Sequence, residues 1–263
     1  MTTILRKLRI RVVVRRYEVI IIGSVLLLSG AVMPSNWEPP FRSFPAPKVD
    51  LVPQHPWIAL TFDDGPHAGK TEALLAVLRE AHVPATFFVV GKMADRYPYL
   101  VRNIARDGHE LANHSYSHPN MSRLSDEAVI GELEQTRDVI QRLTGQDTYL
   151  FRPPGGDFSR RMLRLTAQAG YRMVLWSVLT RDVNGASPRS MTQRILREAG
   201  DGGIVLMHSG MKNTVQMLPE VIAQLRHRGY HFVTVSTLLG LSRSHPALPS
   251  NNSALQIASD KTN

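Results

Sequence analysis

The sequence Thr-Phe-Asp-Asp-Gly-Pro occupies residues 61–66 and directly follows an apolar run, Trp-Ile-Ala-Leu, at residues 57–60. The apolar run predicts a buried strand, and the Gly-Pro pair predicts a turn that leads the chain away from it. Asp63 and Asp64 therefore stand where the strand ends. Because neighbouring residues of an extended segment point to opposite sides, one carboxylate can bind a metal while the other faces substrate or water. A plain turn is the alternative interpretation of these six residues.

Segments with strand and helix patterns alternate from residue 57 onward. About seven strand–helix units imply an α/β fold with a parallel sheet, either closed as a barrel or doubly wound. In a barrel, active residues lie at the C-terminal ends of strands, and the polar motifs of this chain fall at such ends. Strands are expected at 57–60, 84–90, 109–112, 149–151, 171–177, 203–208 and 231–235, and helices at 71–81, 99–106, 125–143, 160–169, 189–199 and 215–228.

Residues 1–33 predict a membrane-targeting segment. Six Arg and Lys residues precede an uncharged, mostly apolar run at residues 19–33. This run suits either a retained single-pass anchor or a cleaved signal peptide, and we favour the anchor because of its long basic lead. The positive flank would stay in the cytoplasm, which leaves the rest of the chain outside. A proline-rich linker is expected at 34–56, a catalytic domain at 57–241 and a disordered tail at 242–263.

Composition excludes some classes of function. The net charge is +9, but residues 1–18 carry five of these charges, and no nucleic-acid-binding motif accompanies them. We therefore expect no nucleic-acid partner. The chain has no cysteine, which excludes a disulfide, a thiolate nucleophile and a thiolate metal site. Nothing in the sequence indicates an obligate protein partner.

A second motif, His-Ser-Tyr-Ser-His, occupies residues 114–118. Two histidines spaced i, i+4 on one helical turn point the same way and can bind one metal, although this spacing also occurs by chance. Imidazole suits zinc and other late first-row metals. Asp64 would complete three protein ligands with an open fourth position, the arrangement of catalytic zinc sites. His109, at a strand start, is expected to hydrogen-bond locally instead.

Three further motifs follow predicted strands. Arg-Pro-Pro-Gly-Gly at residues 152–156 has an unusual backbone that lets a substrate approach the main chain closely. Arg152 suits a carboxylate partner, with a solvent-facing side chain on a plain loop as the alternative. The segment 176–182 adds a polar cluster. His208 ends an apolar strand and is a candidate proton donor, although a lone histidine there is most often structural.

Together, these five motifs resemble those of the polysaccharide deacetylases, the carbohydrate esterases with a NodB-homology domain. The resemblance runs from about residue 57 to 239, with the motifs in the family's order. It implies a distorted (β/α) barrel with fewer strands than the regular eight. It also implies a divalent metal, zinc with cobalt or nickel as alternatives, and the removal of N- or O-acetyl groups from glycans.

The resemblance also implies a role for each motif residue. Two departures, Gly155 in place of a frequent aromatic residue and Leu179 in place of a frequent Asp, bear on substrate choice. The implied metal ligands are Asp64, His114 and His118; the implied catalytic groups are Asp63 as general base, Arg152 as its partner, His208 as general acid and Asp182 as its partner; the expected substrate contacts are Gly155, Leu206 and Trp176.

We therefore expect an extracytoplasmic, metal-dependent hydrolase that removes N-acetyl groups from an N-acetylhexosamine glycan. Peptidoglycan, chitin-like oligomers and exopolysaccharide are the expected substrate classes. An O-acetyl esterase acting on a polysaccharide such as xylan is one alternative. A non-catalytic glycan-binding homologue is another, against which the complete acid–base–metal set argues.

Overall fold

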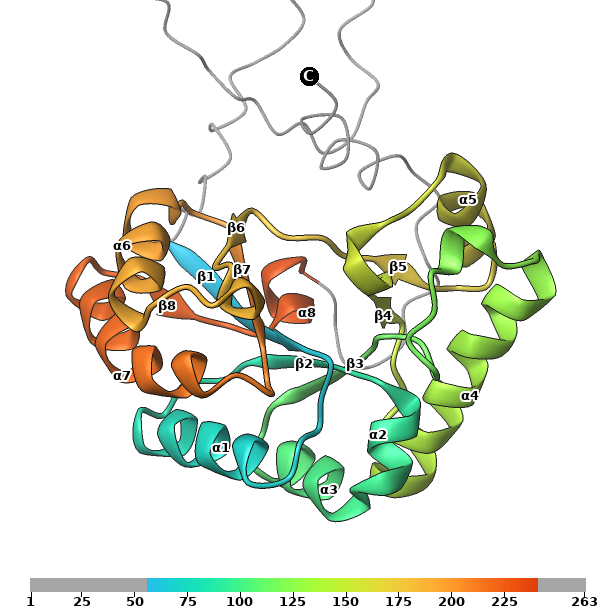
Figure 1. Ribbon diagram of the computed structural model, residues 1–263, viewed down its shortest axis with the longest axis horizontal. Coiled ribbons are helices and arrows are strands. Elements are labelled where there is room, and N and C mark those ends of the chain that lie inside the picture. Colours follow the sequence, from blue (N-terminus) through green and yellow to red (C-terminus); the bar gives the residue numbers. More distant parts are fainter. Residues whose placement is uncertain (1–55, 241–263) are drawn as a thin grey trace, which may run out of the picture. The chain divides into compact units, whose positions relative to one another are not determined.

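The computed structural model describes residues 56–240 of the chain (Figure 1). The expected anchor, the linker up to residue 55 and the tail from residue 241 lie outside the described residues. Among residues 56–240, no helix is long and apolar enough to cross a membrane. The described elements are β1 (Trp57–Asp63), α1 (Lys70–Glu80), β2 (Thr86–Val89), α2 (Gly91–Arg96), α3 (Pro98–Arg106), β3 (Glu110–Asn113), α4 (Asp126–Thr144), β4 (Leu150–Phe151), α5 (Arg160–Gln168), β5 (Arg172–Met173), β6 (Val178–Leu179), α6 (Pro188–Glu198), β7 (Gly203–His208), α7 (Lys212–His227), β8 (His231–Phe232) and α8 (Val235–Leu238), with single 3-10 turns at Met121–Arg123, Pro154–Gly156 and Asp182–Asn184.

The strands form one parallel sheet in the order β5-β4-β3-β2-β1-β7-β6, with β8 paired to β1. Figure 1 shows α6, α7, α1, α3, α4 and α5 arranged around the outside of this curved sheet, whereas the short helix α8 lies nearer the centre of the view. No pairing joins β5 to β6 in the described part of the chain, so the barrel is incomplete. The predicted distorted (β/α) barrel is confirmed.

The central strand β1 is buried on both faces, as its apolar sequence predicts. Ile58, Leu60 and Phe62 pack into the core beneath the helices. The alternate residues, which include Thr61 and Asp63, point to the inner face of the sheet. The last residue of β1, Asp63, is in register with the last residue of β7, His208. The pairing therefore brings a carboxylate and an imidazole to the same edge of the sheet.

Helix α4 follows the capping rules closely. The side chain of Ser125 accepts a hydrogen bond from the backbone N–H of Ala128, and Gly145 ends the helix with a φ of 70°. The predicted span 125–143 differs from the observed helix by one residue at each end. The predicted strand 203–208 matches β7.

Two local predictions were wrong, and two helices were not predicted. The segment 171–177 is not one strand, because it ends after β5 and the chain pairs again only at β6. Helices α2 and α8 were not predicted, and the expected strand 231–235 is shorter, because β8 ends at residue 232 and α8 begins at residue 235. Residues 114–118 form a loop and not a helical turn, since Ser115 and His118 have φ values of 65° and 60°.

Candidate active site

The Asp-Asp pair stands at the junction between strand β1 and the loop that follows it. Asp63 is the last residue of the strand and is 2% exposed. Asp64 has a φ of 69°, a left-handed conformation that aspartate tolerates better than most residues. The change of backbone conformation separates the two carboxylates. Each therefore meets a different set of partners.

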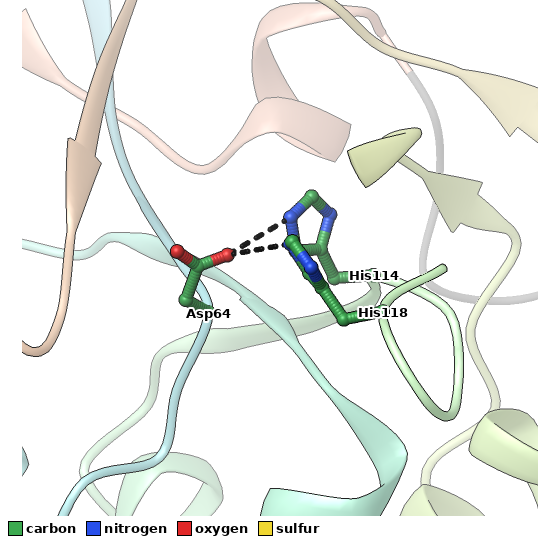
Figure 2. A group of neighbouring side chains, drawn as sticks. All are labelled: Asp64, His114 and His118. Atoms are coloured by element: carbon green, nitrogen blue, oxygen red, sulfur yellow. Dashed lines mark ion pairs between the residues drawn. The ribbon is translucent and has the colours of Figure 1, made fainter. Parts of the chain in front are cut away.

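Asp64 and the two histidines of residues 114–118 converge on one point. The Oδ1 atom of Asp64 lies 3.2 Å from Nε2 of His114 and 3.1 Å from Nε2 of His118 (Figure 2). The three ligand atoms all lie within 4.8 Å of one another. Burial raises the pKa of Asp64, but hydrogen bonds with both histidines outweigh burial and hold the pKa well below its ordinary value. The carboxylate is therefore negative, which is the form that binds a cation.

The hydrogen-bond partner of one ring nitrogen of His114 shows which of its two nitrogens faces Asp64. Nδ1 of His114 lies 2.8 Å from the backbone carbonyl oxygen of Arg152, which can only accept a hydrogen bond. Nδ1 therefore carries a proton, and Nε2 is the nitrogen that faces Asp64; Nε2 donates to the carboxylate when it is protonated and would offer its lone pair to a cation placed between them. Such a second hydrogen bond is usual for metal-binding histidines. One carboxylate and two imidazoles with this orientation fit a divalent metal with an open coordination position.

Asp63 is held by a buried arginine. Nη1 of Arg152 donates to Oδ1 of Asp63 at 2.7 Å and to Oγ1 of Thr61 at 2.8 Å. The guanidinium also donates to the carbonyl oxygens of residues 174 and 175, and it lies 4.0 Å from the ring centre of Phe88. Arg152 is fully buried, which contradicts the alternative of a solvent-facing side chain. The other oxygen of Asp63, Oδ2, lies 3.8 Å from Nε2 of His114.

His208, which is partly buried, forms a second pair with the buried Asp182. Nδ1 of His208 lies 2.8 Å from Oδ1 of Asp182, and the backbone N–H of His208 donates to Oδ2 at 2.7 Å. Burial lowers the pKa of His208, but the hydrogen bond and charge of Asp182 outweigh burial, so the net shift is upward. Nε2 of His208 lies 4.0 Å from Oδ2 of Asp64. The imidazole therefore faces the Asp64–histidine cluster with its second nitrogen.

The three expected substrate contacts differ in exposure. Leu206 is buried in β7, two residues before His208 and on the same face of the strand. Trp176 is half-buried, and a Cβ atom at Gly156 would lie 2.5 Å from its ring. Gly155 has a φ of 66°, and a Cβ atom there would meet no atom within 4 Å. The backbone at Gly155 is therefore open on the side where the family often carries an aromatic ring.

Three residues outside the predicted set contact these pairs or the residues beside them. The hydroxyl of Thr214, on helix α7, donates a hydrogen bond to Oδ2 of Asp182 at 2.7 Å. The backbone N–H of Ser209 donates to the carbonyl oxygen of Asp63 at 3.1 Å, and the Ser209 hydroxyl lies 3.2 Å from Nδ1 of His67. His67 directly follows the Gly-Pro turn, so its position beside the motif was a readable signal. Thr214 and Ser209 gave no such signal.

His109 lies apart from this cluster of motifs. Its Nδ1 accepts a hydrogen bond from the backbone N–H of Ala85 at 3.3 Å, and its ring packs against Phe87. The partner is therefore 24 residues away and not local as expected. Burial lowers the pKa of His109 to about 4, so the imidazole is neutral near pH 7.

The profile of the polysaccharide deacetylase family matches residues 52–174. A peptidoglycan-N-acetylglucosamine deacetylase of Bacillus cereus is 34% identical over 190 residues, which cover 71% of this chain and 69% of that relative. The peptidoglycan-N-acetylmuramic acid deacetylase PdaC of Bacillus subtilis is 34% identical over 202 residues, which cover 76% of this chain and 43% of that relative. A solved peptidoglycan N-acetylglucosamine deacetylase in complex with a naphthalenyl N-oxidanyl-benzamide superposes with a TM-score of 0.70 at 33% identity, and covers 72% of this chain and 90% of that one.

Proposed function

The chain belongs to the polysaccharide deacetylase family, and on this premise we propose that it hydrolyses N-acetyl groups of peptidoglycan outside the cytoplasm with the help of a divalent metal. The observation that carries the proposal is the meeting of three groups at one edge of the sheet. These groups are the Asp63–Arg152 pair, the Asp64–histidine cluster and the Asp182–His208 pair. A base, a cation site and an acid within one set of neighbouring side chains are what amide hydrolysis needs.

Asp64, His114 and His118 would hold the metal, for which we favour zinc. A metal bound there would supply Lewis-acid chemistry, which polarises the acetyl carbonyl and makes water more acidic. Asp63 acts as the general base and accepts a proton from water as the water oxygen adds to the acetyl carbon. Arg152 keeps Oδ1 of Asp63 engaged at 2.7 Å, which leaves Oδ2 to take the proton. The backbone N–H near Gly155 binds the negative oxygen of the tetrahedral intermediate.

His208 acts as the general acid. When the bond between carbon and nitrogen breaks, His208 gives its proton to the leaving amine of the sugar. Asp182 orients the ring through Nδ1 and stabilises its protonated form, which the raised pKa of His208 reflects. The products are acetate and a free amine on the glycan. Leu206, beside His208 on β7, packs against the acetyl methyl group.

Peptidoglycan is the proposed polymer because the relatives named above act on it. Their names divide between N-acetylglucosamine and N-acetylmuramic acid, so we propose an N-acetylated sugar of that polymer and let the experiment decide between the two. The basic lead and the apolar run at 19–33 support a single-pass anchor that holds the enzyme at the outer face of the membrane.

The test is acetate release by the purified full-length chain in the presence of zinc. Peptidoglycan, N-acetylglucosamine oligomers and acetylated xylan would be compared at equal acetyl content. We expect release from peptidoglycan, its loss on addition of a chelator, and its return with zinc. Mass spectrometry of digested product then identifies the deacetylated sugar.

Two results would refute the proposal. Release from xylan alone would identify an O-acetyl esterase. Stoichiometric zinc binding without release from peptidoglycan or the oligomers would identify a glycan-binding homologue. The variant Arg102→Ala changes an exposed charge and serves as a control that should release acetate at the rate of the unaltered chain.

A further inference from the structure

The loop at residues 114–118, here called the histidine loop, has a backbone that its own sequence does not favour. Ser115 and His118 have φ values of 65° and 60°. A left-handed conformation costs a residue with a side chain roughly 1–2 kcal/mol. Within the loop, the hydroxyl oxygen of Ser115 accepts a hydrogen bond from the backbone N–H of His118 at 3.1 Å. Groups outside the loop add to this single bond.

Glu132, on helix α4, accepts hydrogen bonds from the N–H and O–H groups of this loop. Its Oε2 accepts hydrogen bonds from the backbone N–H groups of Tyr116 at 2.8 Å and Ser117 at 2.6 Å. Its Oε1 accepts from the hydroxyl of Ser117 at 2.6 Å. One carboxylate thus satisfies three donors of the histidine loop. Hydrogen bonds to a charged acceptor are the stronger kind.

Helix α2 donates hydrogen bonds to the carbonyl oxygens of the same loop. The backbone N–H groups of Gly91 and Lys92, at the start of this helix, donate to the carbonyl oxygens of Ser115 and Tyr116 at 3.0 and 2.9 Å. A Cβ atom at Gly91 would lie 2.3 Å from a ring carbon of Tyr116, so this approach requires glycine. The histidine loop is therefore clamped between α2 and Glu132.

The two histidines depend on this clamp to different degrees. The ring of His114 is 3% exposed and anchored at Nδ1 by the carbonyl oxygen of Arg152. The ring of His118 is 42% exposed, and within residues 56–240 only Asp64 among the other residues bonds to it. The position of His118 is therefore determined mainly by its backbone.

We propose that Glu132 is a positioning residue for the metal, because its carboxylate holds the backbone that presents His118 to Asp64. The inference rests on the metal site of the proposed function. Glu132→Gln replaces one oxygen by an NH₂ group, which would face a loop donor in place of an acceptor. The matched control is Glu134→Gln, which removes the same charge from an exposed position of the same helix.

The test measures zinc affinity of the full-length chain by competition with a chromophoric chelator. Glu132→Gln should weaken zinc binding about 10- to 100-fold, the usual effect of removing a group that orients a metal ligand. Glu132→Asp should lie between this variant and the original chain, and Glu134→Gln should match the original chain. Urea unfolding in chelator would report separately on the metal-free fold.

Several outcomes would overturn the inference. Unchanged zinc affinity in Glu132→Gln, with or without a loss of fold stability, would make Glu132 merely structural. If Glu132→Gln does not fold, Ser117→Ala removes only the hydroxyl bond and should still weaken zinc binding several-fold; unchanged affinity there would also overturn it. Failure of the original chain to bind zinc would instead refute the proposed function, so the two failures are distinguishable.

Discussion

Replacing Arg152 by methionine should destabilise the protein far more than its loss of one salt bridge suggests. The guanidinium is fully buried and bonds to Asp63, whose side chain is 3% exposed. Methionine fills much of the space but leaves the carboxylate buried and unpaired. Removing one partner of a buried ion pair costs about 3–5 kcal/mol. Domains of this size are stable by about 5–15 kcal/mol, so the variant should still fold.

A second Arg–Asp pair in the same protein provides the control. Arg137 donates to both oxygens of Asp147, at 2.5 and 2.7 Å, but the two side chains are 31% and 27% exposed. Arg137→Met should therefore cost at most about 1 kcal/mol, because water replaces the lost partner. The two pairs share residue types and close contacts but differ in burial. Arg152→Met also removes the bonds to Thr61 and to the carbonyl oxygens of residues 174 and 175, which adds to the expected difference.

The assay is urea unfolding of the full-length chain with a chelator present, so that metal binding does not contribute. The double variant Asp63→Asn with Arg152→Met should be more stable than Arg152→Met alone, because the unpaired charge is gone. Equal costs for the arginine variants at positions 152 and 137 would refute the reasoning. A cost below about 1 kcal/mol for Arg152→Met would refute it as well.

Three further predictions concern turnover and pH. Asp63→Asn should lower acetate release about 10²- to 10⁴-fold at unchanged zinc affinity, and a variant that keeps more than about a tenth of the turnover would exclude Asp63 as the base. Burial lowers the pKa of His208 but Asp182 raises it by more, so the rate of acetate release should fall as pH rises through that raised pKa. Asp182→Asn should move this fall to lower pH in a pH–rate profile. An unmoved profile would contradict the pairing of His208 with Asp182. Burial lowers the pKa of His109 from 6.5 to about 4, so the unfolded chain binds a proton there that the folded chain does not. The free energy of unfolding should therefore fall as pH falls between these values. Urea midpoints at several pH values should fall less for His109→Gln than for the original chain. An equal fall in both would mean that groups other than His109 cause the pH dependence.

The predictable parts of this fold are those set by local sequence. Helix α4 carries a serine cap and a terminal glycine, and β7 is a continuous apolar run, so both were found almost to the residue. The rule that parallel strands end at one edge also explains why Asp63 and His208, far apart in sequence, were expected together. The sheet confirms their register.

The failures have nonlocal causes. The segment 171–177 has a strand pattern, but the guanidinium of Arg152 donates hydrogen bonds to the carbonyl oxygens of Val174 and Leu175, which are then not used for strand pairing. Helix α2 begins with glycine, which predicts no helix, yet contact with Tyr116 requires glycine there. The histidine loop has helical spacing, but Glu132 and α2 stabilise another backbone.

Arg152 serves the site through two chemically independent parts. Its side chain bonds to Asp63, whereas its backbone carbonyl oxygen bonds to His114. A substitution by a residue without a side-chain donor removes the first bond and retains the backbone group that makes the second. If the proposed function holds, a single mutation at this position would lower turnover more than metal affinity. Descendants of such a protein would then have a short evolutionary route from the proposed hydrolase to a glycan receptor that keeps its metal, and a designer could follow the same route on purpose.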